Sequence, residues 1–504
     1  MNHYIFTLLL ISLLLVSCKK DKKKTISAKT VPVSTYTISI TSTSKNNAPA
    51  LQSFTHGVSG SDWLLFAGRT NKTDSIGGLH DLQGNYTSTS FLRKSFNDSI
   101  SVYNVSNDTK ISISLQQLVT SVRTKSSSPK LITALNKNLK VFKNTNALVR
   151  QVGDYLYIVG GYGPKQFNVK NDDYITYNHV AKINVPSMIK IVKGSTLTAS
   201  EWKNVMSFGK NTSLISTGGE LYHLGTTFYL VTGHNFTTSS QKYVDAVYPF
   251  KITTSATNSH ELNISVSTPI TDVDNPTDKV SDNISVFRRR DGPIVPAIYK
   301  SPVTGSLEEG ISIYAGVFKP GEDLQAWNDA IYIHPKWIGE NSRVYTYDKA
   351  YNQNNYSVYA CPDVVAYDAT SGILHTFLLG GIGDGESNTS EPMFGFTNAG
   401  VHIQTNVNNE PLTSTSVKLS NVFNGGASTY YGAEAILFPN KSLTYNTTSS
   451  EIISTKNSFS GTTKVINVGY IFGGIEALEK NPGTFGYKKS LASNKIWKVT
   501  LTKN

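Results

Sequence analysis

The segment Leu156-Tyr-Ile-Val-Gly-Gly161 is a short apolar strand that ends in two glycines, and the chain of 504 residues contains five more apolar segments that end in one or two glycines. These five segments are residues 63–68, 228–233, 311–316, 375–381 and 468–474. Consecutive copies end 65 to 93 residues apart, which leaves room for one four-stranded sheet per copy. The repeats therefore predict one repeated unit rather than several unrelated domains.

Turn residues and partner strands surround these copies. Gly60-Ser-Asp62 and Gly153-Asp154 precede the first two copies and predict tight hairpins. The outer strands of the repeats are expected at residues 100–104, 179–184, 246–252, 330–333, 364–368 and 495–501. Radial repetition of such sheets leaves only short, protected edges. We therefore predict an all-β chain that folds as a β-propeller of six four-stranded antiparallel blades.

Two further elements belong to this prediction. Residues 35–41 alternate polar and apolar side chains, and we expect this strand to pair with the last blade and close the ring. Residues 129–139 carry apolar side chains with helical spacing and predict a short surface helix between the first two blades.

The two glycines that end three of the copies resemble the kelch repeat, in which they allow a sharp turn and close packing. A second resemblance is carried by residues 50–56, 68–71, 78–80, 218–221, 233–236, 289–291, 432–434 and 469–474. Through these segments the chain resembles, over residues 48–501, a family of kelch-like surface or secreted proteins of Bacteroidetes. That resemblance implies a kelch-type propeller and no particular activity.

The N-terminus has the features of an export signal. Residues 5–16 are apolar but too short to span a membrane as a helix. Leu15-Val16-Ser17-Cys18 resembles a bacterial lipobox, which implies that residues 1–17 are a lipoprotein signal peptide and that Cys18 carries the acyl anchor. An ordinary signal peptide that happens to contain a cysteine is the alternative. We expect a lipoprotein of the cell envelope, anchored in outer-membrane lipid and facing the periplasm or the exterior.

Residues 18–35 are expected to form a basic, lipidated tether, and residues 36–504 a single propeller domain with a monomeric body. Residues 19–24 hold five lysines and one aspartate, which accounts for a third of the formal net charge of +12. The rest of the chain has no comparable basic run, so nucleic acid is not an expected partner. Cys361 is the only other cysteine, so no disulfide is expected within the mature chain.

Charged residues next to the repeated strands are the candidate ligand-binding residues, because propellers bind ligands where loops from all blades converge. An arginine can clamp a carboxylate, sulfate or phosphate with two hydrogen bonds. The alternative role of Arg289, Arg290 and Asp291 is to lock neighbouring blades together. The candidates are Arg69, His80, His234, Arg289, Arg290 and Asp291.

Glu220 and Glu434 are the candidate acid and base if the protein is an enzyme, because glycoside chemistry uses two carboxyl groups. Their alternative role is to accept backbone hydrogen bonds between blades. The histidines lack metal-site spacing, so we predict no metal site and no cofactor. Asp272, Asp274, Asp278 and Asp282 offer a weak calcium alternative. Asp74-Ser75 and Asp98-Ser99 resemble acceptors for O-glycosylation.

These observations favour a non-catalytic, lipid-anchored propeller that binds a glycan or a protein at its loop face. The first alternative is a carbohydrate-active enzyme, either a hydrolase or a protein similar to sugar mutarotases and epimerases, that acts on an acidic sugar. A converging group of residues with a carboxyl of raised pKa would favour that alternative. The second alternative is a structural subunit of an outer-membrane complex.

Overall fold

The structure is a computed structural model, and all of its described elements belong to the unit Thr35–Asn504. Residues 1–34, which include Cys18, lie outside the described residues. The structure describes residues 35–71, 79, 91, 93–167, 173–272, 285–319, 326–336, 344–348, 351, 358–383, 395–409, 412–423, 429–480 and 490–504.

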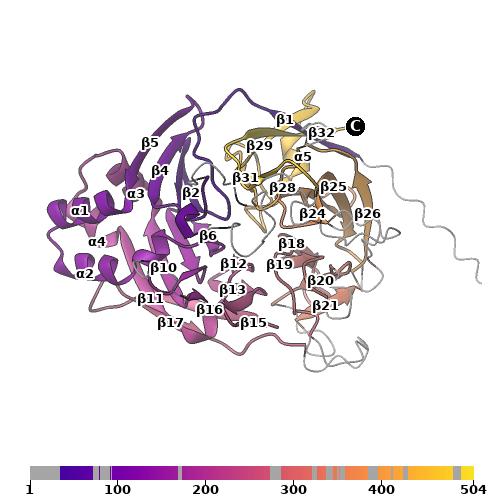
Figure 1. The fold of residues 1–504 in the computed structure, drawn as a ribbon. Coiled ribbons are helices and arrows are strands. Elements are labelled where there is room, and N and C mark those ends of the chain that lie inside the picture. The colour runs from indigo at the N-terminus through magenta and orange to yellow at the C-terminus, as the bar shows by residue number, and fades with distance from the viewer. Residues whose placement is uncertain are drawn as a thin grey trace, which may run out of the picture. The chain divides into compact units, whose positions relative to one another are not determined.

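The fold is all-β, and six antiparallel sheets built on four strands each form most of it (Figure 1). In five of them the strands lie in the order in which they are named here, and the first strand of each is called the inner strand. The first sheet consists of β2 (Thr55–Ser59), β3 (Asp62–Phe66), β4 (Ser99–Asn104) and β5 (Thr109–Ser114), and the second of β6 (Leu148–Val152), β7 (Tyr155–Val159), β10 (His179–Asn184) and β11 (Met206–Lys210). The third sheet consists of β12 (Glu220–Leu224), β13 (Thr227–Val231), β16 (Val247–Thr254) and β17 (Leu262–Val266), and the fourth of β18 (Ile294–Lys300), β19 (Leu307–Tyr314), β20 (Ala330–Ile333) and β21 (Tyr345–Asp348). The fifth sheet consists of β23 (Asp363–Asp368), β24 (Ile373–Gly383), β25 (Gly395–Asn406) and β26 (Ser414–Leu419).

The sixth sheet joins the two ends of the described chain. Its order is β27 (Ile436–Pro439), β29 (Val465–Phe472), β32 (Ile496–Lys503) and β1 (Tyr36–Ser42). Tyr36 pairs with Lys503 and Ser42 with Trp497, so the predicted pairing of the N-terminal strand with the last repeat is observed. This sheet also meets the first one, because the N–H of Gly474 donates to the carbonyl of Leu51 at 2.9 Å and Trp63 stacks on Phe438 at 3.9 Å.

The six glycine-ended segments all form the second strand of their sheet, namely β3, β7, β13, β19, β24 and β29. Each second strand is followed, or in β24 interrupted, by two consecutive residues with positive φ, and Ala67, Thr232 and Ala315 adopt this conformation in the copies that lack the first glycine. The second glycine is also needed for space, since a Cβ on Gly474 would lie 2.3 Å from the carbonyl oxygen of Ala433. The turn geometry is therefore repeated even where the glycine pair is not.

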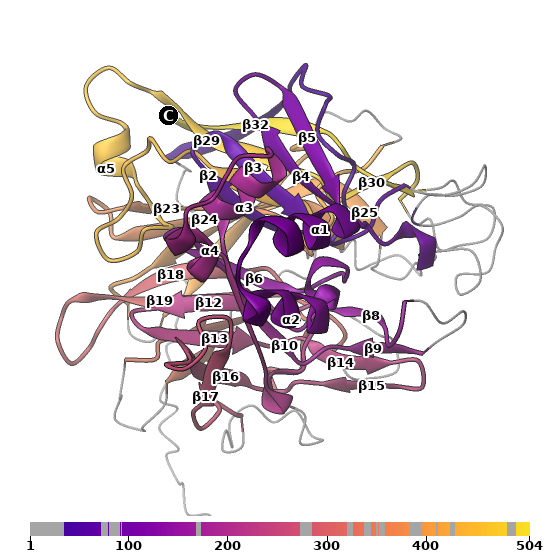
Figure 2. The ribbon, with the colours of Figure 1, turned by 90° about the vertical axis from the view of Figure 1, so that its left-hand side faces the viewer.

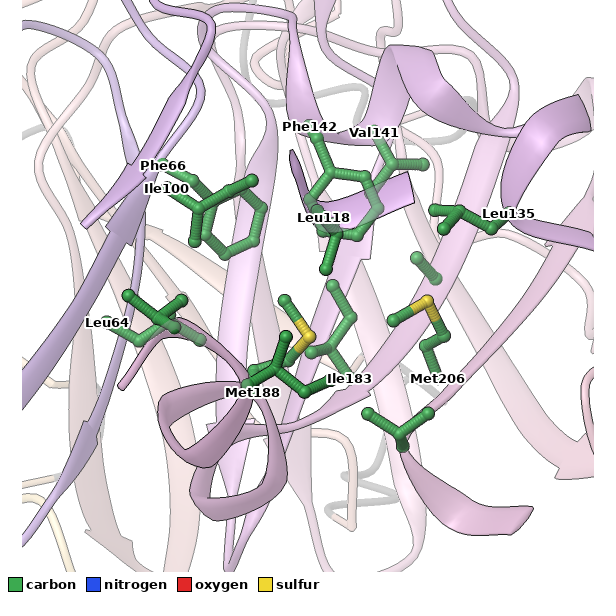
Figure 3. Close-up of a cluster of buried hydrophobic side chains, with 14 of the residues drawn as sticks. Leu64, Phe66, Ile100, Leu118, Leu135, Val141, Phe142, Ile183, Met188 and Met206 are labelled. Atoms are coloured by element: carbon green, nitrogen blue, oxygen red, sulfur yellow. The ribbon is translucent and has the colours of Figure 1, made fainter. Parts of the chain in front are cut away.

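Helices cover the outer parts of the first two sheets (Figure 2). The predicted helix is present as α2, with Ser128 as its N-cap and Pro129 in its first turn. Leu118, Leu135 and Met188 from three helices pack with strand residues in one apolar cluster (Figure 3). The helices are α1 (Leu115–Lys125), α2 (Pro129–Lys137), α3 (Val185–Val192), α4 (Ala199–Asn204) and α5 (Thr455–Ser458), with 3-10 turns at Arg93–Ser95, Leu139–Phe142 and Thr212–Leu214.

Smaller sheets extend the connections between second and third strands. β8 (Tyr162–Pro164) and β9 (Tyr174–Thr176) pair with each other, and β9 joins β14 (His234–Thr237) and β15 (Ser240–Tyr243) in a four-stranded sheet. β30 (Ile475–Ala477) pairs with β31 (Ser490–Ala492), while β22 (Val358–Tyr359) and β28 (Ile453–Ser454) attach to the fifth sheet. None of the helices in the described part of the chain has the length and apolarity to cross a membrane.

One strand prediction is wrong in position. Residues 364–368 were expected to form an outer strand, but β23 is the inner strand of the fifth sheet. It is buried on both faces, because Val365 and Tyr367 pack into one apolar cluster while Val364 and Ala366 pack into another. A strand buried on both faces has no polar alternation that would distinguish inner from outer positions.

Candidate functional site

A cavity of about 390 Å³ lies where the six inner strands meet. Each of the six sheets contributes residues of its inner strand to the wall, and the segment after β27 adds further residues. The inner strands are β2, β6, β12, β18, β23 and β27. The volume falls in the range of pockets that hold small molecules.

Six residues just ahead of the inner strands form a belt around this cavity. All six line the cavity and have φ between 49° and 65°. Five of the six N–H groups donate to the carbonyl of the preceding belt residue, with N–O distances of 2.6 to 3.4 Å, from Asn146 to Ser53 through to Glu434 to Ala360. The Gln52 side chain donates to Glu434 and so connects the last member to the segment beside the first. The belt consists of Ser53, Asn146, Gly218, Asp291, Ala360 and Glu434.

A charged cluster lies farther along the inner strands, and we call it the Arg150 cluster. It consists of Arg150 from β6, Glu220 and Tyr222 from β12, Asp363 from β23, and Glu451. Arg150 forms an ion pair with Glu451, and its guanidinium lies 4.3 Å from the centre of the Tyr222 ring. The Tyr222 hydroxyl donates to the carbonyl of Ile294 at 2.8 Å, which fixes the ring beneath the arginine.

Two carboxyl groups of the Arg150 cluster have raised pKa values. Burial raises the pKa of Glu220 to about 7, although nearby Arg150 acts in the opposite direction. Burial also raises the pKa of Asp363 to about 7, with further contributions from the charges of Glu220 and Glu451. Both groups can therefore gain or lose a proton near neutral pH.

The belt carries a second pair of carboxyl groups. Burial and the charge of Asp291 raise the pKa of Glu434 to about 7, while hydrogen bonds from Gln52 and Asn146 oppose the shift. Burial also raises the pKa of Asp291, although Asp291 forms an ion pair with Arg290. The belt is thus an acceptor-rich rim of the same cavity.

The structure brings together three of the predicted site residues, because Glu220, Asp291 and Glu434 all line the cavity. Arg290 does not line the cavity but contacts it through its ion pair with Asp291. His80 lies outside the described residues.

Arg289 lies away from the cavity and is fully buried. Its Nη2 lies 2.6 Å from Oδ1 of Asp329, and its Nε and Nη1 donate to the carbonyls of Val286 and Ala315. The guanidinium also lies 4.3 Å from the centre of the Trp327 ring. All of these partners lie between Val286 and Asp329, in the segment of the fourth sheet, so the Arg289 side chain packs within that segment rather than linking neighbouring sheets.

Arg69 and His234 also lie outside the cavity wall. Arg69 is buried, donates to the carbonyl of Phe91 and to Oγ of Ser95, and packs over the Phe96 ring at 4.2 Å. His234 is buried in β14, where Gln241 contacts its Nδ1 and burial lowers its pKa to about 3. Both side chains contact protein groups rather than an open site.

Within the described residues, no set of oxygen ligands supports the weak calcium alternative. Asp274, Asp278 and Asp282 lie outside them, and Asp272 accepts hydrogen bonds from the N–H of Val286 and the hydroxyl of Tyr345. Among the described residues, no three His, Cys, Asp or Glu side chains are arranged to hold a metal ion.

Sequence reasoning missed Arg150, Asp363 and Glu451. Arg150 lies three residues before the hairpin glycine Gly153, so treating the strand before each hairpin as cavity wall would have identified it. Asp363 begins the strand that was assigned to the outside. Glu451 lies in a segment without a repeat pattern and is 301 residues from its partner Arg150, so no local signal indicates it.

No protein-family model matches the chain, and no curated protein is similar to it. A solved structure titled "Structure of YjhT" is similar at 11% sequence identity, covering 72% of this chain and 84% of that chain with a TM-score of 0.38.

Proposed function

We propose that this chain is a six-bladed β-propeller whose central cavity binds a small ligand rich in hydroxyl groups, such as one sugar residue at the end of a glycan, without altering it. The observation that carries the proposal is that inner strands from all six sheets line one cavity that contains Arg150 and five carboxyl groups. The belt and the contacts between the sixth and first sheets support a ring closed by β1.

The chemistry of the wall suits hydroxyl groups. A carboxyl with a pKa near 7 accepts hydrogen bonds when ionised and also donates one when protonated. Glu220, Asp363 and Glu434 have this property, and Arg150 supplies donors. Each sugar hydroxyl both donates and accepts, so it can be satisfied by this mixture.

The anchor remains part of the proposal. Cys18 would hold the chain in outer-membrane lipid, residues 18–35 would act as a tether, and the kelch-like surface proteins of Bacteroidetes would be its relatives. A glycan-binding propeller on such a tether would present its cavity to material outside the membrane. The exposed large apolar side chains among the described residues are Ile111, Val303, Val417 and Val465, which belong to different segments and give no particular support to a structural subunit.

The test is binding of the purified full-length chain to a panel of immobilised glycans and free sugars. We expect saturable binding of at least one sugar, weakened about tenfold or more in Arg150→Met because a charged donor is lost. Arg123→Met, at an exposed arginine of α1, is the matched control and should bind like the wild type. Absence of binding across the panel, or equal binding by both variants, would overturn the proposal.

A carbohydrate-active enzyme is the second candidate, and the raised pKa values of Glu220 and Asp363 favour it. Glu434 is the other predicted member of an acid and base pair, and it belongs to the belt rather than to the Arg150 cluster. Proton NMR of each bound sugar over several hours distinguishes the two candidates. A change of anomeric configuration, stereochemistry or linkage faster than in Glu220→Gln supports an enzyme, and unchanged spectra support a binding protein.

A further inference from the structure

The cavity wall is acidic although the chain as a whole is basic. Glu220, Asp291, Asp363, Glu434 and Glu451 line it, against Arg150 and the exposed Lys441. His56 also lines it, but burial lowers the pKa of His56 to about 4, so this side chain is neutral at physiological pH. The formal net charge of the chain, by contrast, is +12.

Ion pairs account for only two of the five carboxylates. Glu451 is paired with Arg150 and Asp291 with Arg290. Within the described residues, Glu220, Asp363 and Glu434 have no ion pair. Among the described residues, three carboxyl groups of the cavity therefore have no basic partner in an ion pair, one on β12, one on β23 and one in the belt.

An acceptor without a donor lies beside the third of these groups. Gln52 is only 3% exposed, and its Nε2 donates to Glu434 and to Ser53. Its Oε1 is buried with no hydrogen-bond partner. A buried acceptor without a partner is unfavourable, and this one adjoins the Glu434 carboxylate although Gln52 itself does not line the cavity.

We infer that the ligand of this cavity carries an ammonium group, as an amino sugar or a polyamine does, and that the unpaired carboxyl groups of Glu220, Asp363 and Glu434 select it. This inference rests on the proposed function of the cavity. An ammonium group has three donors and no acceptor, which matches a wall of carboxylates. An acidic sugar would instead bring a like charge to these carboxylates, and the cavity's arginine already pairs with Glu451.

Isothermal titration calorimetry of the full-length chain at pH 7.5 tests the inference with four ligands: glucosamine, N-acetylglucosamine, glucuronic acid and spermidine. The two glucosamines differ in whether the nitrogen is charged. We expect glucosamine to bind about tenfold or more tightly than N-acetylglucosamine, and glucuronic acid to bind most weakly. Spermidine binding without glucosamine binding would also support the ammonium class and would identify a polyamine as its source.

Variants assign the preference to the carboxyl groups. The double variant Glu220→Gln with Asp363→Asn should lose the preference for glucosamine, so that its affinities for glucosamine and N-acetylglucosamine lie within about twofold of each other. The single variant Glu220→Gln should lose part of the preference, and circular dichroism checks that both variants are folded.

The outcomes separate this inference from the proposal beneath it. Tighter binding of N-acetylglucosamine or glucuronic acid than of glucosamine and spermidine would overturn the ammonium class and leave the cavity as a sugar site. A preference for glucosamine that survives in the folded double variant would also overturn the assignment. No saturable binding of any of the four ligands would overturn the ammonium class, and absence of binding across the glycan panel would overturn the proposed function as well.

Discussion

Arg289 and Arg150 each pair with a carboxylate, but their surroundings differ. Arg289 and Asp329 are 0% and 9% exposed, and protein carbonyls and Trp327 occupy the remaining sides of the guanidinium. Arg150 and Glu451 are 18% and 35% exposed and border a cavity. The first pair is enclosed by protein groups, whereas the second pair leaves polar atoms facing the open space of the cavity. An arginine in this sequence therefore indicates a ligand site only once it is known whether the residue lies on an inner strand that lines the cavity.

The largest expected effect is on the buried pair. Arg289→Met should lower the free energy of unfolding by about 3–5 kcal/mol, because it leaves the Asp329 carboxylate buried without its partner. Arg150→Met should lower it by about 1 kcal/mol or less, because Glu451 can be solvated. Urea unfolding of both variants measures the difference. Equal losses would show that the two pairs are not different in kind.

The next effect concerns the scaffold around the cavity. Gly474→Ala places a Cβ 2.3 Å from the carbonyl oxygen of Ala433 at a φ of +80°, and we expect a loss of about 3 kcal/mol. Gly153→Ala has a φ of +57° and no atom within 4 Å of the added Cβ, so about 1 kcal/mol of left-handed strain is expected. Thermal unfolding of the two variants separates the cost of the close contact at Gly474 from the cost of the left-handed backbone that both positions share. A Gly474→Ala variant as stable as Gly153→Ala would mean that the sixth sheet is less tightly held than described.

Glu220→Gln should act in the opposite direction and stabilise the protein at high pH. The pKa of Glu220 is raised to about 7 from a usual value of 4.5, so the native state keeps a proton that the unfolded state has lost between these values. Stability from this group is therefore present below about pH 4.5 and falls as the pH rises toward 7. The glutamine variant avoids this loss.

We expect Glu220→Gln to be more stable than the wild type by about 1–3 kcal/mol at pH 8 and equally stable at pH 4. Urea unfolding at several pH values gives the difference. The charges nearest to Glu220 are Arg150, Glu451 and Asp363, which are present in both proteins. Because the charge of Glu220 also raises the pKa of Asp363, the difference between the curves includes this coupling. A variant that is less stable than the wild type at pH 8 would contradict the raised pKa.

Much of the fold could be predicted from the sequence because its signals are local. Each second strand carries its own apolar residues and its terminal glycine, and the alternation of residues 35–41 indicated a strand that pairs with β32. The inner position of β23 was missed because a strand buried on both faces has no alternation to interpret. The helices α1, α3 and α4 are held by the shared apolar cluster, which depends on distant strands.

The site was predictable only in part, for a related reason. Glu220, Asp291 and Glu434 were named because each lies next to a repeated glycine or charged segment. Arg150, Asp363 and Glu451 are far apart in the sequence and become neighbours in one cavity wall only where three sheets converge. Arg69, His234 and Arg289 were equally close to the repeats, but their side chains are directed into packing that the sequence does not reveal.

The smallest effect is on a reaction rate rather than on stability. Cys361 lines the cavity, and burial raises the pKa of its thiol, so little of the reactive thiolate is present at pH 8. In a Cys18→Ser variant, alkylation of Cys361 by iodoacetamide should be about tenfold or more slower than after unfolding in urea. Equal rates in the two conditions would indicate a cavity open to bulk water.

The most direct test of the proposed site is a crystal structure of the full-length chain with the tightest-binding sugar or amine of the panel. We predict ligand density inside the cavity, in contact with Arg150 and with at least two of Glu220, Asp363 and Glu434. Density at another surface, with the cavity holding only water at a saturating ligand concentration, would contradict it.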